Sequence, residues 1–142
     1  MDAQWKRIEA IVGNGETITF EDQLATFYEH LHSSLELPCE VTGTEDFRWE
    51  ERYVFGGASR AEYERLRKER PSYQDKYDLL AIEKGVFSEW MLFHGDDIGA
   101  HVKRKSDGKE FWLGLAELKG AGKKSRNAQL LHDFAVFFVN NR

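Results

Sequence analysis

The residues best able to do chemistry in this chain are four groups of acids. Calcium takes about six to eight oxygen ligands, backbone carbonyls and water among them, so carboxylates on loops suit it better than carboxylates on a rigid helix. Two carboxylates across a cleft would also suit a glycosidase, and an acidic pair by itself is most often simply solvated. No Asp-x-Asp-x-Asp-Gly run is present, which excludes an EF-hand. The four groups, all in or beside expected loops, are Glu45-Asp46, Glu50-Glu51, Asp75 with Asp78, and Asp96-Asp97.

No complete catalytic motif accompanies these acids. Residues 120–125 contain glycines and lysines, but a phosphate-binding loop needs glycine at position 117 and a hydroxyl residue at 124, where this chain has Glu117 and Lys124. Cys39 is the only cysteine, and acidic neighbours raise the pKa of a thiol, so we interpret it as structural. The five histidines lack zinc-site spacing. With no nucleophile–base pair and no metal triad, the sequence favours a protein that is not an enzyme.

Composition places the chain among soluble globular domains. Its 142 residues suit a single domain, 1–142, and 41% apolar residues with 13% aromatic residues allow a compact core. The first residues lack the apolar run of a secretory signal, and no apolar stretch reaches the roughly 20 residues that span a bilayer. We therefore expect a cytoplasmic protein that makes no contact with membranes.

The net charge of −5 is unevenly distributed along the chain. Residues 1–35, 36–62 and 75–97 each carry four more acids than bases, whereas residues 100–126 carry 8 bases and 3 acids. The acidic majority argues against general nucleic-acid binding. The basic stretch leaves a local contact with an anion as an alternative, through Lys103, Arg104, Lys105, Lys123 and Lys124.

Apolar residues at helical spacing predict helices at both ends of the chain. A pair of helices lies within residues 1–35, and Thr19 has the position of an N-cap for the second of them. A capping box predicts a further helix over 59–70. Residues 125–140 form a last helix that is apolar on nearly every side, which deep burial or a dimer contact would explain.

Short apolar segments between these helices predict strands. The cleanest alternation puts the aromatic side chains of residues 47–55 on one face, together with Glu51. Asp107-Gly108 indicates a hairpin with a type I′ turn, in which both central residues need positive φ. The predicted class is α+β, with a bent, mainly antiparallel sheet or small barrel of about five or six strands and flanking N-terminal and C-terminal helices. The expected strands are Cys39–Gly43 on or near a sheet edge, Phe47–Phe55, Asp78–Lys84, Val86–Phe93, Ile98–Lys105 and Glu110–Leu115.

Several stretches of the sequence resemble the CcbP-type calcium-binding proteins. They are residues 37–43 and 46–53 (LPCEVTG and DFRWEERY), residues 71–77 (PSYQDKY) and residues 133–140 (DFAVFFVN). The likeness covers roughly residue 36 to the end, so residues 1–35 would be a helical extension outside the family-like core 36–142. The resemblance implies a small acidic protein that binds calcium through loop carboxylates and becomes more compact as it does so.

Carried over to this chain, the resemblance implies a calcium site made of carboxylates. The expected function is a calcium buffer or sensor without enzymatic activity. The alternative is a protein-interaction module that uses its apolar helices, with a protein partner or a second copy of itself. The implied ligands are Glu45, Asp46, Glu50, Asp75 and Asp78, with Asp96 and Asp97 completing that site or forming a second one.

Overall fold

The computed structural model describes residues 2–93, 96–122 and 125–141. Within these ranges the chain forms five α-helices, two short 3₁₀ helices and five strands. None of the described helices is long and apolar enough to cross a membrane. The elements follow one another as α1 Ala3–Val12, α2 Phe20–Ser34, β1 Cys39–Gly43, η1 Arg48–Glu50, α3 Glu51–Val54, α4 Arg60–Arg67, β2 Lys76–Glu83, β3 Gly99–Arg104, β4 Glu110–Gly114, η2 Leu115–Glu117, β5 Leu118–Gly120 and α5 Arg126–Asn140.

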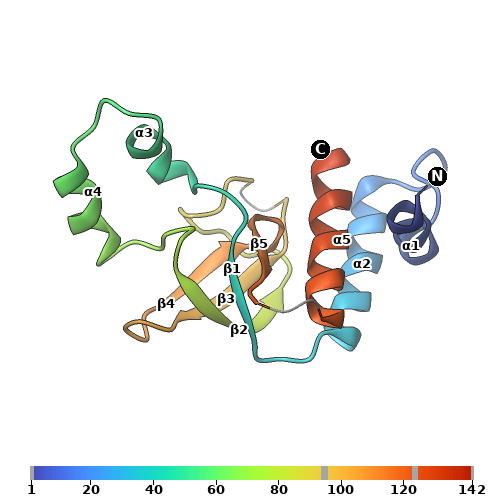
Figure 1. The fold of residues 1–142 in the computed structure, drawn as a ribbon. Coiled ribbons are helices and arrows are strands. Elements are labelled where there is room, and N and C mark those ends of the chain that lie inside the picture. The colour runs from blue at the N-terminus through green and yellow to red at the C-terminus, as the bar shows by residue number, and fades with distance from the viewer. Residues whose placement is uncertain (1, 94–95, 123–124, 142) are drawn as a thin grey trace.

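The five described strands form one antiparallel sheet in the order β4-β3-β2-β1-β5, and this sheet is not closed into a barrel. The predicted α+β class is therefore confirmed. Figure 1 shows α1, α2 and α5 packed together at one end of the sheet, while the short helices α3 and α4 form a separate lobe at the other end. β1 lies one strand in from the edge, because the short strand β5 covers it.

A single hydrophobic core joins the sheet to the helices. Val41 of β1 and Leu79 of β2 are completely buried, as are Phe27 of α2 and Phe134 of α5. The two phenylalanine rings meet edge to face with centroids 5.3 Å apart, and burial of such a side chain contributes roughly 2–3 kcal/mol. α5 is buried on most sides, as its composition predicts, whereas its Val139 remains 62% exposed.

The predicted helix caps are confirmed, and α4 shows where a tertiary contact changes a helix end. α4 ends at Arg67, three residues before the predicted end. The buried guanidinium of Arg104 donates to the carbonyl oxygens of Arg67, Lys68 and Arg70, which have no backbone donor where the helix ends. The hydroxyl groups that accept a backbone N–H at a helix start are those of Thr19, Ser59 and Ser125.

The predicted strand Phe47–Phe55 is wrong, because this segment forms η1 and α3. The Glu50 carboxylate accepts a hydrogen bond from the backbone N–H of Phe47 at 3.2 Å and closes the turn, so that this donor does not serve a sheet. Glu51, which was expected on an aromatic face, is exposed instead. A short apolar run satisfies the period of a strand and of a helical turn equally well, so periodicity alone does not separate the two.

The predicted strand Val86–Phe93 is also wrong. Both edges of β2 are already paired, one with β1 and the other with β3, so a strand returning from Gly85 has no edge to join. A turn forms around Ser88 instead. Its Oγ accepts from the N–H of Trp90 at 3.1 Å and its carbonyl accepts from Met91 at 3.1 Å.

The predicted hairpin at Asp107-Gly108 is confirmed, although its turn is not type I′. Residues 105–108 lie between Arg104 and Lys109, whose backbone N–H and carbonyl are 2.7 Å apart. Gly108 has a φ of 77°, but Asp107 has no positive φ, so this connection is longer than a two-residue turn.

Candidate functional site

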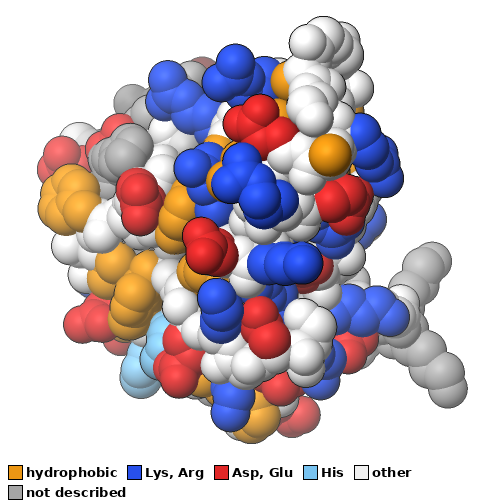
Figure 2. All heavy atoms as spheres, turned by 90° about the vertical axis from the view of Figure 1, so that its left-hand side faces the viewer, with side chains coloured by type: hydrophobic (Ala, Val, Ile, Leu, Met, Phe, Trp, Pro, Cys, Tyr) orange, Lys and Arg blue, Asp and Glu red, His pale blue; other side chains and the backbone are white. Residues whose placement is uncertain are grey.

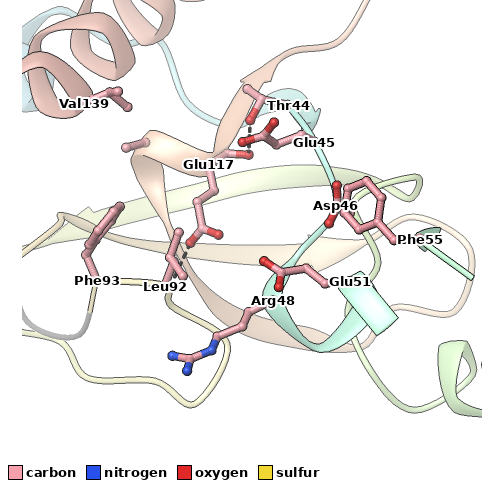
Figure 3. Close-up of a pocket in the computed structure, with 11 residues that line it drawn as sticks. Thr44, Glu45, Asp46, Arg48, Glu51, Phe55, Leu92, Phe93, Glu117 and Val139 are labelled. Atoms are coloured by element: carbon pink, nitrogen blue, oxygen red, sulfur yellow. Dashed lines mark hydrogen bonds between the residues drawn. The ribbon is translucent and has the colours of Figure 1, made fainter. Parts of the chain in front are cut away.

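Four carboxylate side chains among the described residues line one open pocket of about 410 Å³, which we call the acidic pocket. Glu45 and Asp46 follow β1, Glu51 begins α3, and Glu117 ends η2. In Figure 3 the carboxylates of Glu51 and Glu117 point into the same space, while the guanidinium of Arg48 turns away from it. The rest of the lining is mostly apolar and consists of Thr44, Arg48, Phe55, Leu92, Phe93, Ala116 and Val139.

Strand pairing brings these acids together from distant parts of the sequence. β1 and β5 are antiparallel neighbours, with Gly43 opposite Leu118. The backbone N–H of Thr44 donates to the carbonyl of Glu117 at 2.9 Å, and the Thr44 hydroxyl donates to the same oxygen at 3.3 Å. One of the dashed lines in Figure 3 joins these two residues. The residues that follow β1 must therefore lie beside the residue that precedes β5, which places Glu45 next to Glu117.

Glu117 is a half-buried acid that lines the acidic pocket. Burial, with a smaller contribution from the nearby charge of Glu45, raises the pKa of its carboxyl from 4.5 to about 7. The backbone N–H of Leu92 donates to its Oε2 at 3.2 Å and opposes this rise. A negative charge at this position is therefore costly until a cation or a proton neutralises it.

The buried carboxylate of Asp97 reaches Glu117 over Gly114. A Cβ added to Gly114 would lie 2.6 Å from Oδ2 of Asp97 and 2.7 Å from Oε2 of Glu117, so the two carboxylates converge where this residue has no side chain. Asp97 is 2% exposed and accepts hydrogen bonds from the N–H groups of Ile98 and Ala116. Two carboxylates held this close repel one another, and a bound cation would relieve that repulsion.

Comparison with known proteins bears on the fold. No family model matches this chain, and no curated protein sequence matches it. One solved structure with a similar fold is a calcium-binding protein in the calcium-binding form, with a TM-score of 0.56 and 13% identity over 99% of this chain and 92% of that chain. Another is the crystal structure of CcbP from Anabaena, with a TM-score of 0.58 and 12% identity over 98% of this chain and 91% of that chain. The fold is CcbP-like.

Three of the seven predicted ligands lie at this site. Glu45 and Asp46 line the acidic pocket, and Asp97 meets Glu117 beside it. Asp96 is exposed and its backbone N–H donates to the carbonyl of Phe93, but its side chain is not part of the pocket lining.

Glu50 occupies a different environment, at the base of the lobe that α3 and α4 form. It is completely buried, and each of its carboxylate oxygens accepts two hydrogen bonds. Oε1 accepts from the N–H groups of Phe47 and Tyr73, and Oε2 accepts from the hydroxyl groups of Tyr63 and Ser72. Because both oxygens are satisfied by protein donors, Glu50 ties η1, α4 and the segment before β2 together.

Asp75 and Asp78 are each held by basic side chains. Asp75 accepts from the guanidinium groups of Arg67 at 3.2 Å and Arg104 at 3.0 Å, and Asp78 pairs with Nζ of Lys105 at 2.8 Å. Arg104 and Lys105, which were considered as surface contacts for an anion, are therefore already engaged by carboxylates of this chain. Lys123 and Lys124 lie outside the described residues.

The sequence prediction missed Glu117, and it named Glu51 in an acidic pair with Glu50 but left it out of the implied ligand set. Glu51 did have a signal, since it stands beside Glu50 as an acid among aromatic residues. Glu117 had none, because it is a single acid in an apolar segment and its position near Glu45 depends on the pairing of β1 with β5.

The donor set at this site suits a hard cation. It consists of carboxylates with one threonine and nearby backbone carbonyls, without sulfur or imidazole, and these are oxygen ligands of the kind calcium takes. Within the described ranges, no three His, Cys, Asp or Glu side chains stand close enough together to hold one metal ion as they are. Coordination therefore requires the exposed side chains of Glu45 and Glu51 to swing towards Glu117, with backbone carbonyls and water completing the shell.

Proposed function

We propose that this protein binds calcium in the acidic pocket and acts as a calcium sensor. The observation that carries the proposal is the convergence of Asp97 and Glu117 over Gly114, beside three further carboxylates from two other segments. The calcium-binding proteins that share the fold support it. Calcium would be held by Glu117, Asp97, Glu45 and Glu51, with Asp46 at the rim.

A sensor is favoured over a buffer by the place of Glu51 in the fold. Glu51 is the first residue of α3. Phe55 directly follows this short helix, and its side chain is 80% exposed. When Glu51 moves onto a cation beside Glu117, α3 is drawn towards η2 and the exposed aromatic residue moves with it. Binding would then change the surface of the protein as well as fill a site.

Calorimetric titration of metal-stripped protein with calcium, and separately with magnesium, tests the proposal. We expect saturable binding of calcium that Glu117→Gln and Glu51→Gln each weaken about tenfold or more, because each change removes a charged ligand. Glu9→Gln, on the exposed surface of α1, is the matched control and should leave the affinity unchanged.

Two outcomes would contradict the proposal. An absence of saturable heat with calcium would remove calcium binding altogether. A loss of affinity in Asp78→Asn that Glu117→Gln does not show would move the site to the ligands that the sequence resemblance implies, away from the acidic pocket.

Fluorescence of Trp49, which immediately precedes Glu50 and Glu51, should change on binding if α3 moves.

A further inference from the structure

A second surface on the α3 and α4 side of the molecule combines arginines with aromatic rings. It borders an open pocket of about 470 Å³, distinct in most of its lining from the acidic pocket. Figure 2 turns this side of the molecule to the viewer, and Lys and Arg side chains gather over much of it with Asp and Glu side chains between them. We call it the arginine–aromatic surface, and its basic and aromatic members are Arg48, Arg52, Arg70, Trp49, Tyr53 and Trp90.

The rings of this surface are held in place by the fold. The indole N–H of Trp49 donates to the carbonyl of Pro71 at 2.6 Å, which fixes the ring plane. Tyr53 packs against Trp49 with centroids 6.1 Å apart and stacks on the buried Tyr63 at 5.3 Å. A ligand therefore meets aromatic faces that are already ordered, so little conformational entropy is lost on binding.

The guanidinium groups lie against these rings. The Cζ atom of Arg70 is 5.4 Å from the centroid of Trp49, and that of Arg52 is 5.8 Å from the centroid of Tyr53. Stacking of this kind leaves the planar N–H edge of an arginine directed outwards, where it matches a carboxylate with two parallel hydrogen bonds.

No carboxylate in the described part of the chain pairs with these arginines. The side chains of Arg48, Arg52 and Arg70 form no ion pair and no hydrogen bond there, whereas Arg104 and Arg67 are both paired with carboxylates. Three guanidinium groups with unused donors lie beside ordered aromatic rings, and they outnumber the two glutamates of the same lining, so the surface has a net positive charge and a large contact area.

The composition of this surface selects the kind of ligand. Arginine, tryptophan and tyrosine are the residues that contribute most to binding at protein–protein interfaces. Glu51 and Glu89 also line the pocket, and the whole chain has a net charge of −5, so a continuous polyanion such as nucleic acid would meet repulsion along its length. A peptide with spaced carboxylates avoids those two glutamates and can offer apolar side chains to the rings.

We propose that the arginine–aromatic surface docks an acidic peptide segment of a partner protein. Carboxylates of the peptide pair with Arg48, Arg52 and Arg70, and its apolar side chains pack on Trp49 and Trp90. The bound segment lies across the junction of η1, α3 and the end of α4. Docking does not require calcium in the acidic pocket, although Arg48 and Glu51 line both pockets.

Selection from a random peptide library displayed on phage tests the proposal. The full-length protein is the bait, and the variant Arg48→Gln/Arg52→Gln/Arg70→Gln is the counter-selection. We expect the enriched peptides to be rich in Asp and Glu with interspersed aromatic or leucine residues. Fluorescence polarisation of one labelled enriched peptide should then show an affinity at least about tenfold weaker for Arg52→Gln/Arg70→Gln, because each lost arginine pair is a central contact.

Matched variants separate docking from general charge. Arg65→Gln removes an exposed arginine of α4 that does not line the surface, and it should leave the peptide affinity within about twofold of the unchanged protein. Arg52→Lys/Arg70→Lys keeps the charge but loses the paired hydrogen bonds, so it should weaken binding while circular dichroism shows an intact fold. The selection would overturn the proposal if it enriched basic peptides or no peptides at all. Equal binding by the glutamine variant, or tighter binding of a single-stranded oligonucleotide than of the peptide, would also overturn it.

Discussion

Glu117 should make the protein less stable at neutral pH than it would be with an uncharged residue at this position. The perturbation is Glu117→Gln, which keeps an oxygen that can accept the hydrogen bond from the N–H of Leu92 and removes only the charge. Burial, with the charge of Glu45 added to it, raises the pKa of Glu117 from 4.5 to about 7 in the folded protein. The folded state therefore holds this proton more tightly than the unfolded state does.

The sign and size of the effect follow from that difference. Between pH 4.5 and about 7 the folded chain binds more protons at Glu117 than the unfolded chain, so stability falls as the pH rises through this window. A shift of one pKa unit corresponds to about 1.4 kcal/mol. The charged carboxylate therefore lowers the free energy of unfolding by about 3 kcal/mol once the pH exceeds 7. The variant should equal the unchanged protein near pH 4 and exceed it by roughly 2–3 kcal/mol at pH 8.

Urea unfolding followed by circular dichroism at several pH values between 4 and 8, in the presence of a chelator, measures this difference. The control Glu9→Gln alters an exposed residue of α1 and should follow the unchanged protein at every pH. If Glu117→Gln gave no gain in unfolding free energy at pH 8, or an equal gain at pH 4 and pH 8, the assignment of a costly buried charge at Glu117 would be refuted.

Calcium should narrow the difference in stability between the two proteins. A ligand present at about a hundred times its dissociation constant adds roughly 2.7 kcal/mol to the stability of a protein that binds it in the folded state. The unchanged protein should gain this at pH 8, whereas Glu117→Gln, which binds about tenfold more weakly, should gain only about 1.4 kcal/mol at the same calcium concentration. A residue that destabilises the empty protein and is needed for the ligand is the usual exchange of stability for function.

Three further changes test other parts of the structure. Gly114→Ala should weaken calcium binding about tenfold in calorimetry, because the new Cβ would lie within 3 Å of both converging carboxylates; an unchanged affinity would contradict this geometry. Arg104→Met should lower the urea unfolding free energy by about 3–5 kcal/mol, because it leaves carboxylates and helix-end carbonyls without their donor, and a loss below about 1 kcal/mol would contradict that role. Calcium should tighten peptide docking about fivefold, because Arg48 and Glu51 line both pockets and a cation withdraws Glu51 from the arginines. Glu51→Gln should abolish this coupling. Equal peptide affinity with and without calcium would exclude it.

Features set by neighbouring residues could be predicted from the sequence. Ser59 and Ser125 begin helices because their hydroxyl groups satisfy N–H groups a few residues away. The hairpin at Gly108 and the apolar period of α5 are local in the same sense. The strand predicted over residues 86–93 does not form, because an apolar segment can add to a sheet only where an edge is free. β3 already pairs with the edge of β2 that this segment would have joined.

The same distinction applies to the candidate site. Glu45 and Asp46 could be chosen because two consecutive acids after a strand are visible in the sequence. Glu117 could not, because a lone acid acquires its neighbours only when β1 and β5 pair, and its burial depends on the segment that contains Leu92. Asp75 and Asp78 look equally suitable as ligands until the structure shows the arginine and lysine groups that pair with them.

Glu50 and Glu51 show why neighbouring acids need not share a role. Glu50 is surrounded by four protein donors, so its charge is stabilised by the fold, and coordination of a metal would require at least one of these hydrogen bonds to break. The Glu51 side chain is exposed at the acidic pocket, and its carboxylate forms no hydrogen bond or ion pair within the described chain, so a cation would displace mainly water from it. A calcium ligand must be available as well as charged, and of the two adjacent glutamates only Glu51 meets both requirements. The difference arises because Glu50 turns inward to close η1 and thereby fixes the start of α3, which presents Glu51 to the pocket.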